Sequence, residues 1–180
     1  MPESFDALVA EYERRIYNVV LRILGDPDEA ADVTQEVFIS AYKSFDRFRG
    51  ESHPYTWLYQ IAINHCRNRL RKRVRDRRVR VESLDTAGGS LEDGAQTRDI
   101  PDATHAPHAV LEEKELRQRI LDAIEGLPPE YREVVVLREM QNLSYNDIAE
   151  ATGLSLDNVK TRLSRARLML RRRLEHYYQG

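Results

Sequence analysis

The segment 143–165 combines signals for a helix start, a turn and a second helix start, in an order that leaves few folds open. Ser144 and Asp147 stand three residues apart at the beginning of a run with helical periodicity, which predicts a capping box at a helix N-terminus. Gly153 supplies the left-handed residue that ends such a helix, and Ser155 is placed to cap the next one. This order of signals predicts a helix-turn-helix.

The second of these helices should turn Val159 and Leu163 inward and leave a polar, basic face outside. Arg and Asn side chains on such a face can pair with guanine and adenine edges in the major groove of a DNA duplex. The residues that we expect to contact duplex DNA are Asn158, Lys160, Thr161, Arg162, Ser164 and Arg165. A helical hairpin with a merely charged surface is the alternative.

Apolar residues recur at helical spacing along most of the remaining chain. No stretch alternates with period two over enough residues to require a strand, so the predicted fold class is all-α. The predicted helices that precede the helix-turn-helix cover about 5–24, 27–48, 54–80, 110–125 and 130–140.

Positive charge is concentrated in two blocks, 67–80 and 160–173, although the net charge of the chain is only -2. Between them, the segment 81–109 is acidic, contains Gly, Ser and Pro, and lacks sustained apolar periodicity, which is typical of a flexible linker. We therefore expect two small helical domains, 1–80 and 110–180. The two basic blocks indicate two contacts with a polyanion. The alternative is that each block is only a solvated helix face.

Aromatic residues gather just before the first basic block, from Tyr42 to Tyr59. Aromatic faces beside a cationic groove suit unstacked bases, each stack contributing roughly 1 to 3 kcal/mol. Polar groups such as Asn64 follow on the same helix and are available to the Watson–Crick edge of a base. Burial of Trp57 and some tyrosines in a core is the alternative.

Other function classes find little support in the composition. The single cysteine, Cys66, allows no internal disulfide and is expected to be a buried thiol. We find no nucleophile with a base at a meaningful spacing, no metal-ligand cluster and no Gly-rich phosphate loop, so we predict no catalytic residue, metal or cofactor. No run of about 18 apolar residues occurs, and a cytoplasmic location without membrane insertion is expected.

On these residues the sequence resembles the extracytoplasmic-function sigma factors, the smallest group of sigma subunits of bacterial RNA polymerase. The resemblance covers nearly the whole chain apart from the linker. It is carried by Asp32–Tyr42 (DVTQEVFISAY), Phe45–Gly50 (FDRFRG), Tyr55–Asn64 (YTWLYQIAIN) and the stretch from Leu127–Arg132 (LPPEYR) through Arg167.

The resemblance implies that 1–80 is similar to sigma region 2 and 110–180 to sigma region 4. A set on the second helix should dock on the clamp of the largest polymerase subunit: Asp32, Gln35, Glu36, Phe38 and Ile39. Another set should hold the promoter's -10 element as a melted strand: Phe48, Ser52, Tyr55, Trp57, Asn64, Arg67, Asn68 and Arg71.

By the same resemblance, the helix-turn-helix should read the -35 element as duplex, and the second domain should contact the polymerase flap. An anti-sigma factor is an expected partner, and the acidic linker should run toward the RNA path of the polymerase. The alternatives are a free-standing helix-turn-helix regulator and, with less support, a nuclease acting on the bound strand.

Overall fold

The computed structural model describes residues 4–46, 48, 53–84 and 107–178, and within these ranges the chain forms helices and turns but no strand. The all-α prediction is confirmed. In chain order the elements are α1 (Phe5–Leu24), α2 (Pro27–Phe45), α3 (Pro54–Leu84), α4 (Pro107–Glu125), α5 (Pro129–Val135), the π-helix η1 (Val136–Met140), α6 (Tyr145–Thr152) and α7 (Leu156–Tyr178). No helix in this described part of the chain has both the length and the apolar character needed to cross a bilayer.

Local signals set the boundary between α1 and α2 as predicted. Gly25 ends α1 with a φ of 74°, and its N–H donates to the carbonyl of Leu21 at 2.8 Å. Glycine adopts this left-handed conformation without the strain that a Cβ atom introduces. Asp26 then accepts a hydrogen bond from the N–H of Glu29 at 2.9 Å and caps α2, with Pro27 in the first turn.

The helices differ from the predicted ones mainly at their ends. α2 ends at Phe45 instead of about residue 48. α3 reaches Leu84 and α4 begins at Pro107, so both helices enter the segment 81–109 that we expected to be a linker. Arginine has a high helix propensity, and α3 therefore continues through the basic block beyond the apolar residues that set its period. The remainder of the expected linker lies outside the described residues.

The helix predicted over 130–140 changes its hydrogen-bonding pattern partway and ends as the π-helix η1. Asn142 follows with a φ of 56°, and the N–H of Leu143 donates to the carbonyl of Leu137 at 3.1 Å. This bond spans one residue more than the equivalent bond at the end of an α-helix, which matches the wider π turn.

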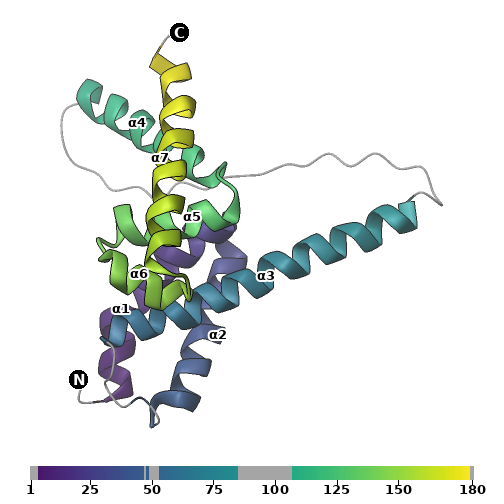
Figure 1. The fold of residues 1–180 in the computed structure, drawn as a ribbon, viewed down its shortest axis with the longest axis vertical. Helices are drawn as coiled ribbons and strands as arrows, with labels where there is room; N and C mark the ends of the chain where they lie inside the picture. Colours follow the sequence, from purple (N-terminus) through teal and green to yellow (C-terminus); the bar gives the residue numbers. More distant parts are fainter. Residues whose placement is uncertain (1–3, 47, 49–52, 85–106, 179–180) are drawn as a thin grey trace.

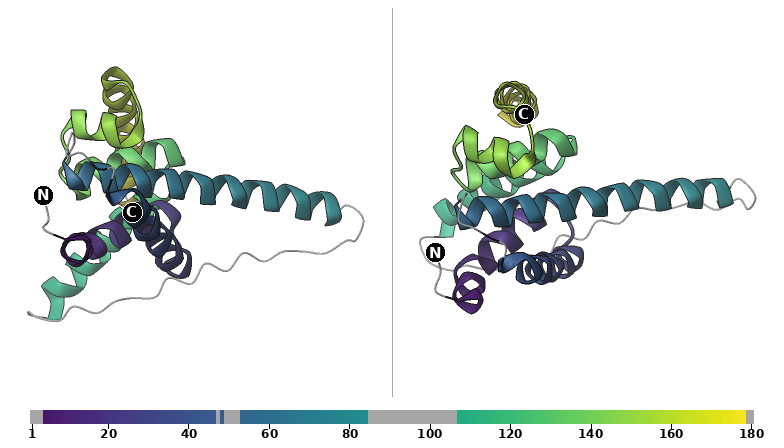
Figure 2. Two further views of the ribbon diagram at one scale, coloured as in Figure 1. Left: turned by 90° about the horizontal axis from the view of Figure 1, so that it is seen from below. Right: turned by 60° about the horizontal axis from the view of Figure 1, so that its bottom comes forward.

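The long helix α3 lies at the centre of the structure. Figure 2 shows α1 and α2 on one side of it and α5, α6 and α7 on the other. Its C-terminal part extends well away from the other helices (Figure 1). Helices α1–α3 make up the N-terminal half of the chain, and helices α4–α7 make up the C-terminal half.

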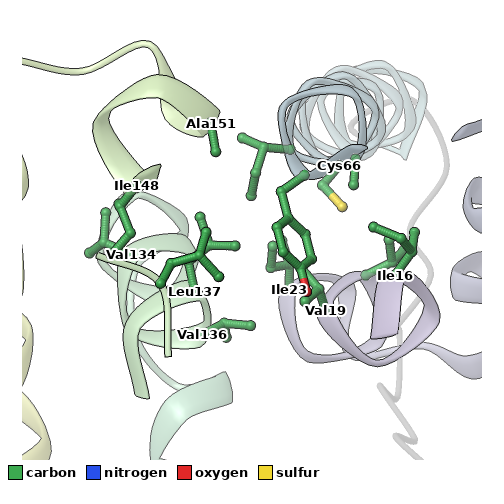
Figure 3. Packing of buried hydrophobic residues seen from close by; sticks show 14 of the residues in the cluster. Ile16, Val19, Ile23, Cys66, Val134, Val136, Leu137, Ile148 and Ala151 are labelled. Atoms are coloured by element: carbon green, nitrogen blue, oxygen red, sulfur yellow. The ribbon is translucent and has the colours of Figure 1, made fainter. Parts of the chain in front are cut away.

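One apolar core runs across both halves. Ile23 from α1 and Leu137 from η1 are 2% and 0% exposed and belong to one cluster of buried side chains. In Figure 3, the labelled side chains of the C-terminal half, among them Leu137 and Val136, face Val19 and Ile23 of α1. The two expected domains therefore bury apolar surface against each other as well as within themselves.

Cys66 lies in this core on α3, as predicted, and is 1% exposed. Burial, with a smaller contribution from the charge of Glu133, raises the pKa of its thiol to about 12.

We therefore expect the native protein to resist thiol reagents, because a pKa of about 12 leaves only about one thiol in ten thousand ionised at pH 8. Absorbance measured after addition of Ellman's reagent should show almost no reaction in buffer and one equivalent in guanidinium chloride. A native rate close to that of free cysteine would contradict the buried position.

Candidate nucleic-acid interface

The turn between α6 and α7 has the geometry that the sequence predicts. The N–H of Asp147 donates to Oγ of Ser144 at 3.1 Å, and the N–H of Ser144 donates to Oδ2 of Asp147 at 3.2 Å, which completes the capping box. Gly153 ends α6 with a φ of 69°. Oγ of Ser155 then accepts a hydrogen bond from the N–H of Asn158 at 3.3 Å, at the start of α7.

α7 buries one face and exposes the opposite one. Val159 and Leu163 are 0% and 1% exposed and pack into the core. The exposed face, called the recognition face below, carries five of the residues predicted for duplex DNA: Asn158, Lys160, Thr161, Ser164 and Arg165. These side chains share one surface and are open to solvent.

Arg162, the sixth residue predicted for duplex DNA, is placed differently. Its guanidinium turns toward α5, where Nη1 donates to Oε1 of Glu133 at 3.3 Å and to the carbonyl of Glu130 at 3.4 Å. Its side chain is about one-third exposed. The structure therefore does not place Arg162 with the recognition face.

The C-terminal part of α7 adds further basic residues, and some of them already have acidic partners. Nη2 of Arg167 donates to Oε1 of Glu139 at 2.7 Å, and this hydrogen bond raises the pKa of the guanidinium above its usual value. Arg171 and Arg172 are exposed on the next turn. α7 thus continues the positive surface beyond the recognition face.

In the N-terminal half, two of the predicted strand-binding aromatics contact each other, and the third, Tyr55, contacts other residues. Phe48 and Trp57 stack with their ring centroids 4.7 Å apart. The ring centroids of Tyr55 and His53 are 4.1 Å apart, and the hydroxyl of Tyr55 donates to Oδ2 of Asp147 at 3.4 Å. Burial, and next the negative charge of Asp147, raise the pKa of Tyr55 above its usual value. Tyr55 therefore bridges to the capping box of α6.

The polar residues predicted for the melted strand divide into two groups on α3. Asn64, Asn68 and Arg71 are exposed and share a face through their spacing of four and three residues. Arg67 instead points at the C-terminal half, where it binds both carboxylate oxygens of Glu133 and the carbonyl of Thr152. Ser52, which was also predicted here, lies outside the described residues.

A groove of about 620 Å³ follows this junction between α3 and the C-terminal half. Arginines from both halves line it, namely Arg67 and Arg71 from α3 and Arg162 from α7, together with apolar side chains such as Leu70 and Leu154. Glu130 and Glu133 line the groove as well, so it combines charges of both signs with apolar walls.

The residues predicted to dock on the polymerase form a stripe along α2. Four of them are exposed at helical spacing, Asp32, Gln35, Glu36 and Ile39, and are called the docking stripe below. The fifth, Phe38, is half-buried against the ring of Phe5, with centroids 6.5 Å apart. Ile39 is 54% exposed, which is unusual for a large apolar side chain on an otherwise polar face.

Three contacts hold Glu36 of the docking stripe and its neighbour Ser40 in place from α3. Arg69 and His65 lie 3.0 Å and 3.3 Å from the two carboxylate oxygens of Glu36. The other ring nitrogen of His65 lies 2.9 Å from Oγ of Ser40. Helix α3 therefore positions part of the docking stripe.

Sequence reasoning placed Tyr42 among the aromatics for unstacked bases, and it did not single out Glu133, which lies at the junction of the two halves. Tyr42 is 68% exposed and continues the docking stripe one turn beyond Ile39, a position that helical spacing alone indicates. Glu133 connects Arg67 with Arg162, and no sequence signal points to it, because its partner on α3 lies 66 residues away.

Among the residues that the structure describes, no three His, Cys, Asp or Glu side chains gather as a metal site would require.

The comparisons with known proteins agree with this geometry. Residues 8–76 match the family model of sigma-70 region 2, and residues 117–170 match that of sigma-70 region 4. The RNA polymerase sigma-H factor of Pseudomonas aeruginosa is 37% identical over 164 residues, which are 91% of this chain and 82% of the relative. The ECF RNA polymerase sigma-E factor of Escherichia coli K12 is 36% identical over 166 residues, which are 92% and 83% of the two chains.

Two solved structures share the fold. The sigma factor RpoE of Bartonella quintana, in complex with the anti-sigma factor NepR, superposes with a TM-score of 0.72 at 24% identity and covers 95% of this chain and 96% of its own. CnrH, in complex with the cytosolic domain of CnrY, superposes with a TM-score of 0.63 at 22% identity and covers 96% and 88% of the two chains.

The matches to regions 2 and 4 lie in the N-terminal and C-terminal halves, and relatives above 30% identity span most of the chain. A free-standing regulator with a helix-turn-helix would account for the second match only. The chain therefore belongs to the extracytoplasmic-function sigma factors, which direct RNA polymerase to promoters.

Proposed function

We propose that this protein binds core RNA polymerase and carries it to promoters in which the C-terminal half reads the -35 element as duplex and the N-terminal half holds the -10 element as a melted strand. The observation that carries the proposal is the recognition face of α7, which is exposed while Val159 and Leu163 on the opposite face are buried in the core. The protein supplies specificity in the cytoplasm and leaves catalysis to the polymerase.

The recognition face has the chemistry of direct readout. Arg165 can donate two hydrogen bonds to guanine and Asn158 can pair with adenine, whereas Lys160 suits a phosphate. The capping box and Gly153 fix the angle at which α6 presents α7 to the groove. Arg162 then serves to hold α7 on α5 through Glu133 and contributes less to base readout than the exposed residues.

Residues 54–71 of α3 carry side chains that can bind an unpaired DNA strand. Asn64, Asn68 and Arg71 offer exposed hydrogen-bonding groups along one face. Phe48 and Trp57 present stacked rings nearby, and such rings accept unpaired bases of any sequence. A base that leaves the duplex can stack on the rings and pair with an amide such as that of Asn64.

The docking stripe on α2 supports binding to the clamp of the largest polymerase subunit. It combines acidic and amide groups with exposed Ile39, and exposed Tyr42 follows one turn further on. Such a mixture of apolar anchors and a polar rim is typical of protein interfaces. The C-terminal half would contact the flap, and the segment 81–109 would connect domains 1–80 and 110–180. Because both solved relatives hold partners and RpoE holds an anti-sigma factor, we also propose an anti-sigma factor for this chain.

The deciding experiment mixes the protein with core RNA polymerase and a promoter library and measures specific transcript initiation. Initiation from sites that share a defined -35 and -10 pair supports the proposal. Tight DNA binding without any association with the polymerase would refute it.

Replacement of Arg165 by Ala should weaken binding of the holoenzyme to its best -35 sequence by about 1 to 3 kcal/mol, because a bidentate hydrogen-bonded contact with a base edge is lost. Electrophoretic mobility shifts on matched and mismatched -35 duplexes measure this. Arg172→Ala is the matched control, and it should weaken all duplexes equally because a phosphate contact carries no sequence information. An equal loss on all sequences for Arg165→Ala would assign Arg165 to the phosphates as well.

Replacement of Asn64 by Ala should slow open-complex formation and leave the affinity for core polymerase nearly unchanged, because the amide serves the flipped base and not the docking stripe. Permanganate footprinting measures strand opening, and fluorescence anisotropy measures polymerase affinity. Asn18→Ala makes the same change at an exposed position of α1 and should alter neither quantity. Loss of polymerase affinity in Asn64→Ala would contradict the assigned role.

A further inference from the structure

Four polar side chains, called the polar cluster below, meet across the contact between α2 and α3. Glu36 and Ser40 are one turn apart on α2, and they face two residues of α3, His65 and Arg69, that are also one turn apart. Nη2 of Arg69 donates to Oε1 of Glu36 at 3.0 Å, and Nδ1 of His65 lies 3.3 Å from Oε2. Nε2 of His65 lies 2.9 Å from Oγ of Ser40. Each oxygen of the Glu36 carboxylate therefore has a partner on α3.

These contacts leave the carboxylate partly open to another molecule. The side chain of Glu36 is 48% exposed, whereas those of Arg69 and His65 are 22% and 26% exposed. A carboxylate has roughly four acceptor sites, two on each oxygen. The contacts from α3 occupy one site on each oxygen, so the carboxylate is held from the protein side and retains acceptor sites on the solvent side.

The order of Ser40, His65 and Glu36 is also that of a nucleophile, a base and the acid that orients the base. Ser40, however, lies in the interior of α2, where backbone N–H groups are used in the hydrogen bonds of the helix. The N–H groups next to Ser40 are therefore not available to stabilise an oxyanion, as acyl transfer requires. The polar cluster is suited to orienting its members and not to transferring a group.

A second ion pair joins the same two helices outside the docking stripe. Arg73 of α3 donates to Oε2 of Glu29 through Nε at 2.9 Å and through Nη2 at 2.6 Å. Buried apolar side chains, such as Val37 of α2 and Ala62 of α3, lie in the same core cluster. Because these contacts already hold α2 against α3, the polar cluster acts mainly on the direction of the Glu36 carboxylate.

We propose, on the basis of the function proposed above, that Arg69 and His65 are positioning residues for the binding of RNA polymerase. They hold the Glu36 carboxylate in the orientation in which its remaining acceptor sites meet a basic side chain of the clamp, the kind of donor that makes the strongest hydrogen bonds to a carboxylate. An unrestrained glutamate loses side-chain entropy when a partner fixes it, and restraint within the free protein removes this cost from binding. Neither positioning residue needs to touch the polymerase.

The test measures the affinity for core RNA polymerase by fluorescence anisotropy. Arg69→Gln should weaken binding about three- to tenfold, the cost of fixing one flexible side chain on association. Arg69→Lys keeps a cationic donor and should restore most of the lost affinity. At saturating polymerase, permanganate footprinting should show the same promoter opening for both variants, because the exposed amides of Asn64 and Asn68 are unchanged.

A double-mutant cycle separates the orientation of Glu36 from a loosened contact between the helices. In the Glu36→Ala background, Arg69→Gln should have no further effect on polymerase affinity, because no carboxylate remains to be oriented. Glu29→Gln is the matched control, since it removes the other ion pair between α2 and α3 and should change polymerase affinity less than about twofold.

Three results would overturn the proposal. The first is an equal loss for Arg69→Gln with and without the Glu36 carboxylate, and the second is an equal loss for Glu29→Gln and Arg69→Gln. The third is tighter binding of Arg69→Gln, which would mean that Arg69 competes with the polymerase for the carboxylate.

Circular dichroism establishes that each variant is folded. Should Arg69→Gln not fold, His65→Phe removes both hydrogen bonds of the imidazole and keeps a ring. It should weaken polymerase binding about threefold in the otherwise unchanged chain and not at all in the Glu36→Ala background, and no loss in either would overturn the positioning role. If the unchanged chain does not bind polymerase, the proposed function itself fails. Binding by the unchanged chain that no variant alters counts against the positioning role alone.

Discussion

A buried carboxylate needs at least one cationic partner, and Glu133 has one from each half of the chain, Arg67 and Arg162. Arg162 ties it to α7, so the orientation of the helix that carries the recognition face depends on this group. Arg67 ties it to α3, so the contact between the two halves depends on it as well. Much of the polar geometry at the junction, including the capture of the Thr152 carbonyl by Arg67, follows from the need to pair this one charge.

Different sets of residues on helix α3 make different contacts. Its apolar residues, such as Leu58, Ile63 and Cys66, fill the core, while Arg69 and His65 orient Glu36 of the docking stripe. Asn64 and Asn68 are exposed on the same turns. Under the proposed function, a change on this helix should affect polymerase docking, strand capture or the contact between the halves according to its angular position. Adjacent residues are therefore expected to have different phenotypes.

Features governed by neighbours in sequence could be predicted, and those governed by distant partners could not. The boundary at Gly25, the capping box of Ser144 and the buried position of Cys66 depend on local periodicity and cap chemistry. Arg67 and Arg162 read equally well as DNA contacts from their sequence, because nothing near them reveals Glu133. The π-helix is missed for a related reason, since a single widened turn leaves the apolar pattern almost unchanged.

The apolar core and the ion pair of Arg67 with Glu133 contribute differently to the contact between the halves. Val136 and Leu137 lie opposite Val19 and Ile23, and burial of each such side chain contributes about 1.5 to 3 kcal/mol. The net contribution of a buried ion pair is smaller, because desolvation offsets most of the attraction, but a pair that loses one member is strongly destabilised. The core thus supplies most of the free energy that holds the halves together, and the ion pair adds a penalty for any arrangement that leaves Glu133 without a partner. Any partner that separates the halves must therefore cover apolar surface on both of them, and short duplex DNA alone offers no such surface.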